Sequence, residues 1–513
     1  MAQKRTTTEG RAAAGAVERK VLVRKPGRAA SASEPGRERL MSPLQRSRLE
    51  RRGTLEAITG NGVISACVMI LAAVAAVICA NTDLYYPLHE WFAQPVTIAI
   101  GGWEFSLTFE LFVNDFLMAI FFLLVGIELK YEMTVGELRQ PRQALLPMLA
   151  AVGGVVLPAA IYVVVNRGGA VYGWAIPMAT DIAFALGVLS LLGSRVPPAL
   201  KVFFSTLAIA DDLLAIAAIA LFYGHAPQLG WLAAAALVTA GLVFLNRRRF
   251  FGVAPYLTLG LVLWFCLFQS GVHATLAGVI LAFTIPARSD INARALVSWV
   301  ESKLPDLDER FDAEAHILGQ HDFTHAVTRV ERVMHRVTPP LQRLEHRIAA
   351  PVNFIILPLF AFVNAQVRLV GVDMLALAVD PVAVGVYLGM LLGKTFGILG
   401  VTYLMVRAGL AELPKGVGWR HIAGIGILGG IGFTMSILIA GLAFTEIPAE
   451  LLAAKTAILA GSVSAAVIGL AFMTFACRGD GPREEAEAAA PGDAQAPGNA
   501  QAPDAPAVQA GAE

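Results

Sequence analysis

Two adjacent aspartates, Asp211 and Asp212, lie near the middle of an apolar stretch, FFSTLAIADDLLAIAAIALFY, which runs from Phe203 to Tyr223. About twenty apolar residues are enough for a helix to cross a bilayer. A charged residue at the centre of such a helix costs roughly 2.5 to 3.5 kcal/mol on insertion scales, so two of them are a poor choice for a purely structural position. The pair therefore indicates a functional site inside a membrane.

The whole chain has the composition of a membrane protein. Of its 513 residues, 56% are hydrophobic and only 15% are charged, and the mean hydropathy is +0.63. This is too apolar for a soluble globule, so we expect an all-α polytopic membrane protein. The four cysteines show no CxxC spacing, so we expect them to pack among apolar residues rather than form disulfides or bind a metal.

The two ends of the chain differ from its middle. The first 58 residues contain fourteen Lys or Arg against six acidic residues, and the segment 477–513 is rich in Ala, Pro and Gly. We expect 1–57 and 477–513 to be disordered cytoplasmic segments on either side of a membrane domain at 58–476. A basic arm can bind nucleic acid, but ahead of a membrane domain it more often lies against anionic lipid, so no nucleic-acid partner is expected.

Hydropathy predicts twelve membrane spans. Lys and Arg gather in every second loop, as expected for cytoplasmic loops, and the loops on the opposite side contain only Arg167 and Arg368. Both termini are therefore predicted to be cytoplasmic. The expected spans are 58–80, 111–129, 144–165, 175–192, 200–223, 229–245, 254–268, 271–285, 352–370, 381–406, 422–444 and 451–475.

Two loops are long enough to carry structure of their own. The external loop 81–110 contains TIAIGGWEFSLTF, which is typical of a β-hairpin around a Gly-Gly turn. Such a hairpin either pairs with a second subunit through its edge or packs on its own protein. The cytoplasmic loop 287–347 is charged and in part helical. Its HDFTH motif has the spacing of a metal-binding pair, but no further ligands follow at helical spacing, so a solvated surface is favoured.

Few ionisable residues lie deep within the spans. Besides the aspartate pair, Asp181 and Lys394 are too far from either surface to reach water along their own side chains. Neighbouring helix residues point about 100° apart, so Asp211 and Asp212 cannot form the facing dyad of an intramembrane aspartyl protease. One carboxyl can instead bind a cation while the other turns to a partner helix, where Lys394 is the obvious counter-charge. A Lys–Asp pair that only joins two helices is the simpler alternative.

Spans four and eleven carry residues that interrupt a helix. Span four contains Pro177, Thr180 and Asp181, and span eleven contains five glycines between residues 424 and 432. Broken helices are tolerated in lipid only where protein or a cavity satisfies the freed backbone groups. If both helices break and cross, Asp181 compensates two positive helix ends and Lys394 two negative ones. For span eleven alone, close helix packing through glycine is the alternative.

Several segments together resemble the NhaA-type sodium/proton antiporter family: ATDIAFALGVLSLLG, LAIADDLLAIAAIALFY, SGVHATLAGVI, LLGKTFGI and GGIGFTMSI. The resemblance runs from about residue 60 to residue 476 and includes VNDFLMAIFFLLVGIELK and LPLFAFVNA. It implies a fold of twelve transmembrane helices with two inverted repeats and two discontinuous crossing helices, spans four and eleven. It also implies a homodimer, joined partly by the external hairpin, in the bacterial inner membrane.

The resemblance also implies roles for individual residues. Asp211 and Asp212 match the cation- and proton-binding pair of the family, with Asp212 the principal Na⁺ ligand. Thr180 and Asp181 match residues of a broken helix near the site, and Lys394 matches a lysine that pairs with the first aspartate. Asp115 matches an acidic residue of the second helix, on an accessory cation pathway. The residues that match positions linked to the pH response are Glu128, Glu345, His346 and His273.

These observations lead to the hypothesis of an electrogenic antiporter in which a carboxyl exchanges its proton for Na⁺ or Li⁺, because the two cannot occupy one site together. No cofactor is expected, and the chain is predicted to be a transporter rather than an enzyme. The alternative is a sodium-coupled symporter of an organic anion, which needs a roomy pocket with fixed arginine or aromatic groups, and no deep arginine is present. An intramembrane hydrolase needs a nucleophile or a facing carboxyl pair, which adjacent aspartates do not provide. The chain has Ala349 and Ala350 where family members often carry a further histidine, a difference that bears on the pH response.

Overall fold

The computed structural model describes residues 62–100, 103–139, 141–224, 227–289, 291 and 293–479. The chain divides into two units, Met1–Ala57 and Ile58–Glu513, and all described residues belong to the second. The predicted arm 1–57 lies outside the described residues, as does the predicted tail from residue 480 onward.

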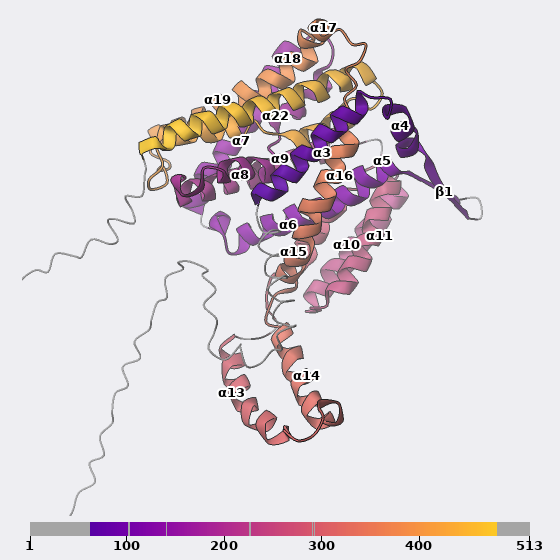
Figure 1. Cartoon of the computed structure of the whole chain (residues 1–513), viewed down its shortest axis with the longest axis vertical. Helices are drawn as coiled ribbons and strands as arrows, with labels where there is room; N and C mark the ends of the chain where they lie inside the picture. The colour runs from indigo at the N-terminus through magenta and orange to yellow at the C-terminus, as the bar shows by residue number, and fades with distance from the viewer. Residues whose placement is uncertain are drawn as a thin grey trace, which may run out of the picture. The chain divides into compact units, whose positions relative to one another are not determined.

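The described part of the chain is almost entirely helical (Figure 1). Its long apolar helices are α3 (Gly62–Ala80), α6 (Met118–Thr134), α7 (Pro141–Val165), α9 (Pro198–Phe222), α10 (Leu229–Arg247), α11 (Val253–Ser270), α19 (Lys394–Arg407) and α22 (Pro448–Ala476). The other α-helices are α4 (Tyr85–Ala93), α5 (Phe109–Leu111), α8 (Ile182–Ser190), α12 (Leu276–Thr284), α13 (Ala293–Arg310), α14 (His321–His335), α15 (Pro340–Pro351), α16 (Leu357–Asn364), α17 (Met374–Ala378), α18 (Pro381–Leu388), α20 (Trp419–Leu428) and α21 (Phe433–Ala443). The 3-10 helices are η2 (Glu137–Arg139), η3 (Val171–Met178), η4 (Gly193–Arg195), η5 (Ile317–Gly319) and η8 (Cys477–Gly479).

The helices identify a polytopic membrane protein. Among the described residues, ten helical segments are long and apolar enough to cross a membrane, and the bent pair α20 and α21 brings the number to eleven. The expected span 271–285 contains α12, which is nine residues long and therefore too short to be counted by length. Gly271 ends α11 in the left-handed conformation, with φ 79°, which glycine adopts without steric cost.

A β-hairpin lies where the sequence predicts two short strands. β1 (Pro95–Ile100) and β2 (Trp103–Thr108) pair in antiparallel register. At the base of the hairpin, Phe92 of α4 is buried and stacks on Phe109, with ring centroids 5.4 Å apart. Phe92 also meets Phe362 of α16 edge to face at 6.4 Å. These aromatic contacts join the base of the hairpin to the helices.

Glycines allow α7 and α19 to pack closely. A Cβ atom on Gly153 would overlap the carbonyl oxygen of Gly397, and one on Gly397 would overlap that of Gly153. One turn away, Gly393 meets the backbone of Pro158 in the same manner. This close approach fixes the position of α19, whose first residue is Lys394.

Three π-helical turns interrupt the α-helical geometry within the described residues: η1 (Phe112–Leu117), η6 (Val352–Ile356) and η7 (Gly389–Gly393). The last of these ends directly before Lys394, whose N–H donates to the carbonyl oxygen of Gly389, five residues earlier. A π turn holds one residue more than an α turn, so it rotates the side chains that follow it. The direction of the Lys394 side chain therefore depends on η7.

Predicted spans four and eleven form short helices on either side of non-helical residues. Residues 179–181 separate η3 from α8, and α20 and α21 meet at 47° across residues 429–432. The two interruptions contact each other. The Asp181 N–H donates to the carbonyl oxygen of Ile431 at 2.7 Å, and Ser436 Oγ donates to that of Ile176 at 2.7 Å. Backbone groups freed by one interruption are thus satisfied by the other.

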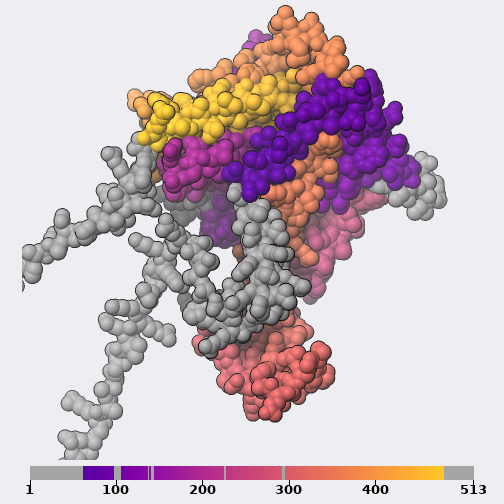
Figure 2. Space-filling model, viewed as in Figure 1, coloured from indigo at the N-terminus to yellow at the C-terminus, as the bar shows by residue number. Residues whose placement is uncertain are grey.

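The outer face of this region carries an apolar groove. Figure 2 shows α3 in indigo beside α22 in yellow, and a cavity of about 570 Å³ lies between them. Phe184 of α8 and Phe433 of α21 both line this groove. The beginnings of α8 and α21 therefore approach an apolar surface that the membrane-spanning helices α3 and α22 border.

Candidate ion-exchange site

Helix α9 places both aspartates inside the protein. Pro198 occupies the first turn of α9, where the N–H that proline lacks has no partner in any helix. Asp211 is 0% exposed and Asp212 is 4% exposed. Because neighbouring residues on a helix point about 100° apart, the two carboxyls face different surroundings.

Asp211 is held by an ion pair and a hydroxyl group. Lys394, which is 0% exposed, donates from Nζ to Asp211 Oδ2 in a short ion pair. Thr180 Oγ1 lies 2.7 Å from the same carboxylate oxygen, and Lys394 Nζ lies 3.0 Å from Thr180 Oγ1. The three side chains come from α19, from the interruption before α8 and from α9, so the cluster joins three separate parts of the sequence.

Thr180 also connects this cluster to α20. Its Oγ1 lies 2.8 Å from the carbonyl oxygen of Gly429, the residue that follows α20. A hydroxyl group has a single hydrogen, so Thr180 can donate to Asp211 or to Gly429, but not to both at once. Since Lys394 donates to Thr180, the hydroxyl stands between the ion pair and the end of α20.

Asp181 satisfies the beginnings of two helices with one carboxylate. Its Oδ1 accepts from the Phe184 N–H at 3.1 Å, in the first turn of α8. Its Oδ2 accepts from Thr434 twice, from the N–H at 3.3 Å and from Oγ1 at 2.8 Å, in the first turn of α21. A negative charge at the N-terminal ends of helices is stabilised by the unpaired N–H groups there.

Asp212 differs from Asp211, whose Oδ2 is held by Lys394 and Thr180. Its Oδ1 is buried without a hydrogen-bond partner among the described residues, and the same is true of the second oxygen of Asp211, Oδ1. The charges that act on Asp212 come from Asp211, Asp181 and Glu128, which repel its negative form, and from Lys394, which attracts it. A buried carboxylate in this setting needs a proton or a cation. These are the properties of a group that exchanges one for the other.

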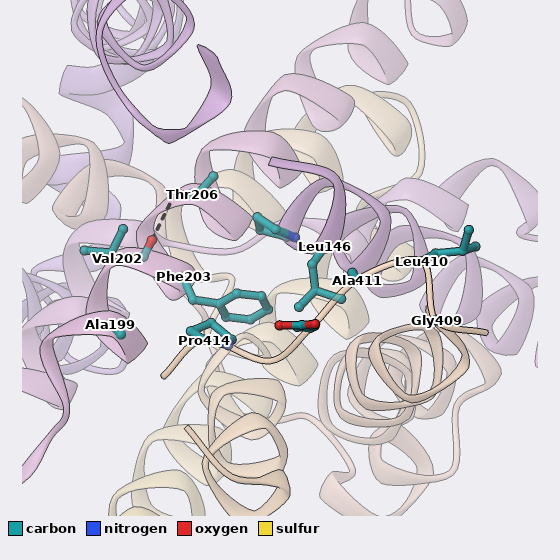
Figure 3. A pocket seen from close by; sticks show the side chains of 11 residues that line it. Leu146, Ala199, Val202, Phe203, Thr206, Gly409, Leu410, Ala411 and Pro414 are labelled. Atoms are coloured by element: carbon teal, nitrogen blue, oxygen red, sulfur yellow. Dashed lines mark hydrogen bonds between the residues drawn. The ribbon is translucent and has the colours of Figure 1, made fainter. Parts of the chain in front are cut away.

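A separate cavity of about 740 Å³ lies at the beginning of α9, against α7 and the segment 409–414 (Figure 3). Figure 3 shows the ring of Phe203 beside Pro414, and the dashed line marks Thr206 Oγ1 donating to the Val202 carbonyl oxygen at 3.0 Å. Neither aspartate lines this cavity. It is therefore distinct from the aspartate site.

Residues 56–473 match the sequence model of a family described as Na⁺/H⁺ antiporter 1. The match covers the helical body and all the side chains of the aspartate site. The chain belongs to this family.

Proteins named Na(+)/H(+) antiporter NhaA are similar over most of their length. One from Oleidesulfovibrio alaskensis is 44% identical over 421 residues, which cover 82% of this chain and 93% of that protein. One from Mesorhizobium japonicum is 43% identical over 438 residues, covering 85% and 97%. One from Saccharophagus degradans, named Na(+)/H(+) antiporter NhaA 1, is 44% identical over 403 residues, covering 78% and 87%.

Membership of the Na⁺/H⁺ antiporter 1 family confirms the resemblance found in the sequence. It places the chain among transporters rather than enzymes. Together with the apolar helices, it also confirms a multi-pass membrane protein.

The other residues to which the resemblance gives roles lie outside the aspartate cluster. Asp115 is half-buried in η1, and its backbone carbonyl oxygen accepts from Trp264 Nε1 at 3.3 Å. α6 packs against α15, and this brings Glu128 close enough to Glu345 for their charges to interact. His346 is exposed on α15, and His273 is half-buried in the turn before α12. The structure thus groups Glu128 with Glu345 and leaves Asp115 and His273 on other elements.

Two polar contacts between separate helical elements were not predicted from the sequence. Lys130 Nζ donates to the carbonyl oxygens at the end of α12, at 3.2 Å from Ala282 and 2.7 Å from Phe283, and also to that of Ile285. Asn364 Nδ2 donates to Asn114 Oδ1 at 2.6 Å, which joins α16 to η1. The position of Lys130 near the end of a span is compatible with a side chain in water, so its role as a helix cap gives no signal in the sequence.

Proposed function

We propose that this chain is an electrogenic antiporter that exports Na⁺, or Li⁺, in exchange for H⁺ across the bacterial inner membrane, for pH and sodium homeostasis. The observation that carries this proposal is the difference between two adjacent buried carboxyls. Asp211 is paired with Lys394 and bonded to Thr180, whereas Asp212 Oδ1 has no hydrogen-bond partner among the described residues. A carboxyl without a fixed partner is free to bind a proton or a cation in turn.

In this proposal the two aspartates have different tasks. Asp212 is the principal Na⁺ ligand, and its proton leaves when Na⁺ enters, because one buried carboxylate cannot hold both charges. Asp211 takes part in cation and proton binding through Oδ1, which has no hydrogen-bond partner among the described residues. Lys394 and Thr180 hold Asp211 Oδ2 and support the site.

We further propose twelve transmembrane helices with two inverted repeats, in which α12 is the short span, within a membrane domain at 58–476 flanked by cytoplasmic ends. The two interrupted helices, η3–α8 and α20–α21, are discontinuous crossing helices. Asp181 compensates the positive beginnings of α8 and α21 through the bonds described above. Lys394 compensates the opposite ends through Thr180, which reaches the Gly429 carbonyl oxygen.

The outer residues complete the proposal. Asp115 belongs to an accessory cation pathway, and Glu128, Glu345, His346 and His273 take part in the pH response. The hairpin of β1 and β2 joins two copies of the chain in a homodimer through its edge.

The proposal is tested by reconstituting the full chain in proteoliposomes that contain a pH-sensitive dye. After an acid-inside pH gradient is set, addition of Na⁺ or Li⁺ outside is expected to dissipate it without any organic solute. Asp212→Asn keeps the size of the side chain but removes its charge, so it is expected to abolish this response. Asp373→Asn, which changes an exposed helix cap, is the matched control and is expected to behave as the wild type.

Dissipation of the gradient by Na⁺ that persists in Asp212→Asn would contradict the assignment of the exchange site. A wild-type response that requires an organic anion would favour the symporter instead. The NhaA relatives described above, which are all named as Na(+)/H(+) antiporters, give that alternative no support.

A further inference from the structure

The apolar groove between α3 and α22 lies apart from the aspartate pair (Figure 2). Its volume of about 570 Å³ is within the range of small-molecule sites, which is roughly 300 to 1,000 Å³. On α22 the lining runs from Thr456 to Ser464, a rise of about 12 Å in the middle of the helix. The groove therefore lies at the depth of the hydrocarbon, and a ligand reaches it from the bilayer.

The lining of the groove is almost entirely apolar. Ile70 and Val74 of α3 are 37% and 49% exposed, and Val463 of α22 is 60% exposed, so these side chains are open to a ligand. No charged side chain is among the described residues that line the groove. A charged ligand would find no counter-charge here, at a depth where charge is costly. The ligand that fits is therefore uncharged and largely apolar.

Three hydroxyl groups interrupt this apolar lining, all of them on α22. Thr456 Oγ1 donates to the Leu452 carbonyl oxygen at 2.8 Å. Ser464 Oγ lies 3.1 Å from the hydroxyl oxygen of Tyr387. Ser462 is 3% exposed, and its Oγ has no hydrogen-bond partner among the described residues, although a serine in a helix can donate to a carbonyl oxygen one turn earlier. Because a buried hydroxyl without a partner is costly, Ser462 indicates a ligand with an oxygen that accepts a hydrogen bond.

Two phenylalanine rings line the same groove. Phe184 lies in the first turn of α8, and Phe433 is the first residue of α21. Aromatic rings pack favourably against other flat rings. Both residues adjoin the bonds of Asp181, which accepts from the N–H groups of Phe184 and Thr434. A ring bound in the groove therefore contacts the beginnings of both interrupted helices.

We propose that this groove binds a membrane-soluble quinone. A quinone has a flat ring for Phe184 and Phe433, a carbonyl oxygen that accepts from Ser462 Oγ, an apolar tail for the aliphatic lining, and no charge. A phospholipid acyl chain also fits the aliphatic side chains, but its ester oxygens lie at the headgroups and leave Ser462 without a partner. Bound quinone packs against the first turns of α8 and α21, and it thereby restrains the two helices that Asp181 caps.

The test is equilibrium binding of tritiated decylubiquinone to the full chain in detergent, measured by scintillation proximity. The wild type is expected to bind the quinone saturably. Ser462→Ala removes the hydroxyl and is expected to weaken binding about fivefold, as for the loss of one hydrogen bond. Thr474→Val is the matched control, because it removes a hydroxyl from α22 outside the groove, where Thr474 donates to the Leu470 carbonyl oxygen. Its affinity for the quinone is expected to equal that of the wild type.

A second pair of variants tests the space itself. Ala460 lines the groove with an exposed side chain, so Ala460→Phe fills the groove and is expected to abolish saturable binding. Val467 lies two turns further along the same face of α22, is 63% exposed and does not line the groove. Val467→Phe is therefore expected to bind as the wild type. Absence of saturable binding by the wild type overturns the proposal, and so does an equal loss in Ala460→Phe and Val467→Phe.

Competition with unlabelled decylbenzene distinguishes a quinone site from a site for any hydrocarbon. Decylbenzene keeps a ring and the tail but has no carbonyl group, so it is expected to bind the wild type about fivefold less tightly than the quinone. Ser462→Ala is expected to leave the affinity for decylbenzene unchanged. If decylbenzene competes as well as unlabelled decylubiquinone, the groove holds any apolar chain, such as that of a lipid, and the proposal is wrong. Binding is measured without transport, so it can fail while Na⁺/H⁺ exchange stands, and the reverse.

Discussion

Replacing Asp181 by asparagine is expected to leave one of two helix beginnings without its cap. The carboxylate accepts from the Phe184 N–H with one oxygen and from Thr434 with the other. Asparagine has one acceptor oxygen, and its NH₂ group would face the N–H of whichever helix that oxygen does not serve. One buried backbone N–H, at the beginning of α8 or of α21, therefore loses its partner.

The expected cost follows from these contacts. A buried donor without a partner costs about 1–3 kcal/mol, and loss of a helix cap typically costs about 1 kcal/mol. Relief of burying a charge offsets part of this. The net loss of stability is therefore expected to be smaller than the sum of these two costs, about 1–3 kcal/mol. Taking about 2 °C per kcal/mol for a large domain, the melting temperature falls by about 2–6 °C.

Thermal unfolding in detergent measures this loss. The side chains of Cys266 and Cys477 are buried, so a thiol-reactive dye reports their exposure as the helical body opens. Asp373 provides a matched control, because it caps α17 on the exposed surface through the N–H groups of Leu375 and Ala376. Asp373→Asn is expected to lower the melting temperature by no more than about 2 °C.

The variants at this contact are expected to lose stability in proportion to the hydrogen bonds they remove. Thr434→Val removes one hydrogen bond to Asp181 and keeps both backbone bonds, so its loss is expected to be smaller than that of Asp181→Asn. Asp181→Ala removes every bond of the carboxylate and is expected to lose the most. Equal melting temperatures for Asp181→Asn and Asp373→Asn would refute the view that one buried carboxylate secures both helices.

Three further predictions concern packing and charge. Lys394→Met leaves Asp211 buried without its ion pair and is expected to lower the free energy of unfolding by about 3 kcal/mol or more. The double variant Asp211→Asn with Lys394→Gln is expected to recover most of this stability. A double variant as unstable as the single one would argue against the pair. Gly278→Ala is expected to lower the melting temperature because the added Cβ meets the backbone of α6, while Gly241→Ala, with nothing within 4 Å, is expected to be neutral or slightly stabilising. Lys130→Met is expected to speed hydrogen exchange at the end of α12 by leaving its carbonyl oxygens uncapped, and unchanged exchange would contradict this role.

The parts of the site that sequence could predict are those whose cost in lipid is high. Asp211, Asp212, Asp181 and Lys394 stand out because an ionisable group deep in an apolar span is expensive. Pro177 and the glycines of residues 424–432 stand out because they break helices. The short extended segment 179–181 and the 47° bend across residues 429–432 lie at these positions. The high cost of a charged group in lipid identifies the position, but it does not identify the residue that the group contacts.

The hydrogen-bond partners of these side chains and some of the helix geometry could not be predicted. They depend on backbone N–H and C=O groups, which nearly every residue carries, so the sequence does not show which of them is contacted. The bonds from Thr180 to the Gly429 carbonyl oxygen and from Lys130 to the end of α12 are of this kind. The π turn η7 is another, since its residues GMLLG have no feature that separates a π turn from an α turn. The length of α12 was also missed, because hydropathy over 271–285 does not reveal that residues 271–275 form a turn.

The adjacency of Asp211 and Asp212 has a geometric reason. Two carboxyls four residues apart would lie on one face of α9, so the same lysine would attract both. Adjacent residues point about 100° apart, and this lets α9 turn Asp211 toward Lys394 while Asp212 faces elsewhere. Both nevertheless remain close enough that the charge of one acts on the other. One helix can thus hold a fixed charge and an unpaired carboxyl side by side, and any ion that binds Asp212 changes the field in which the Asp211–Lys394 pair lies.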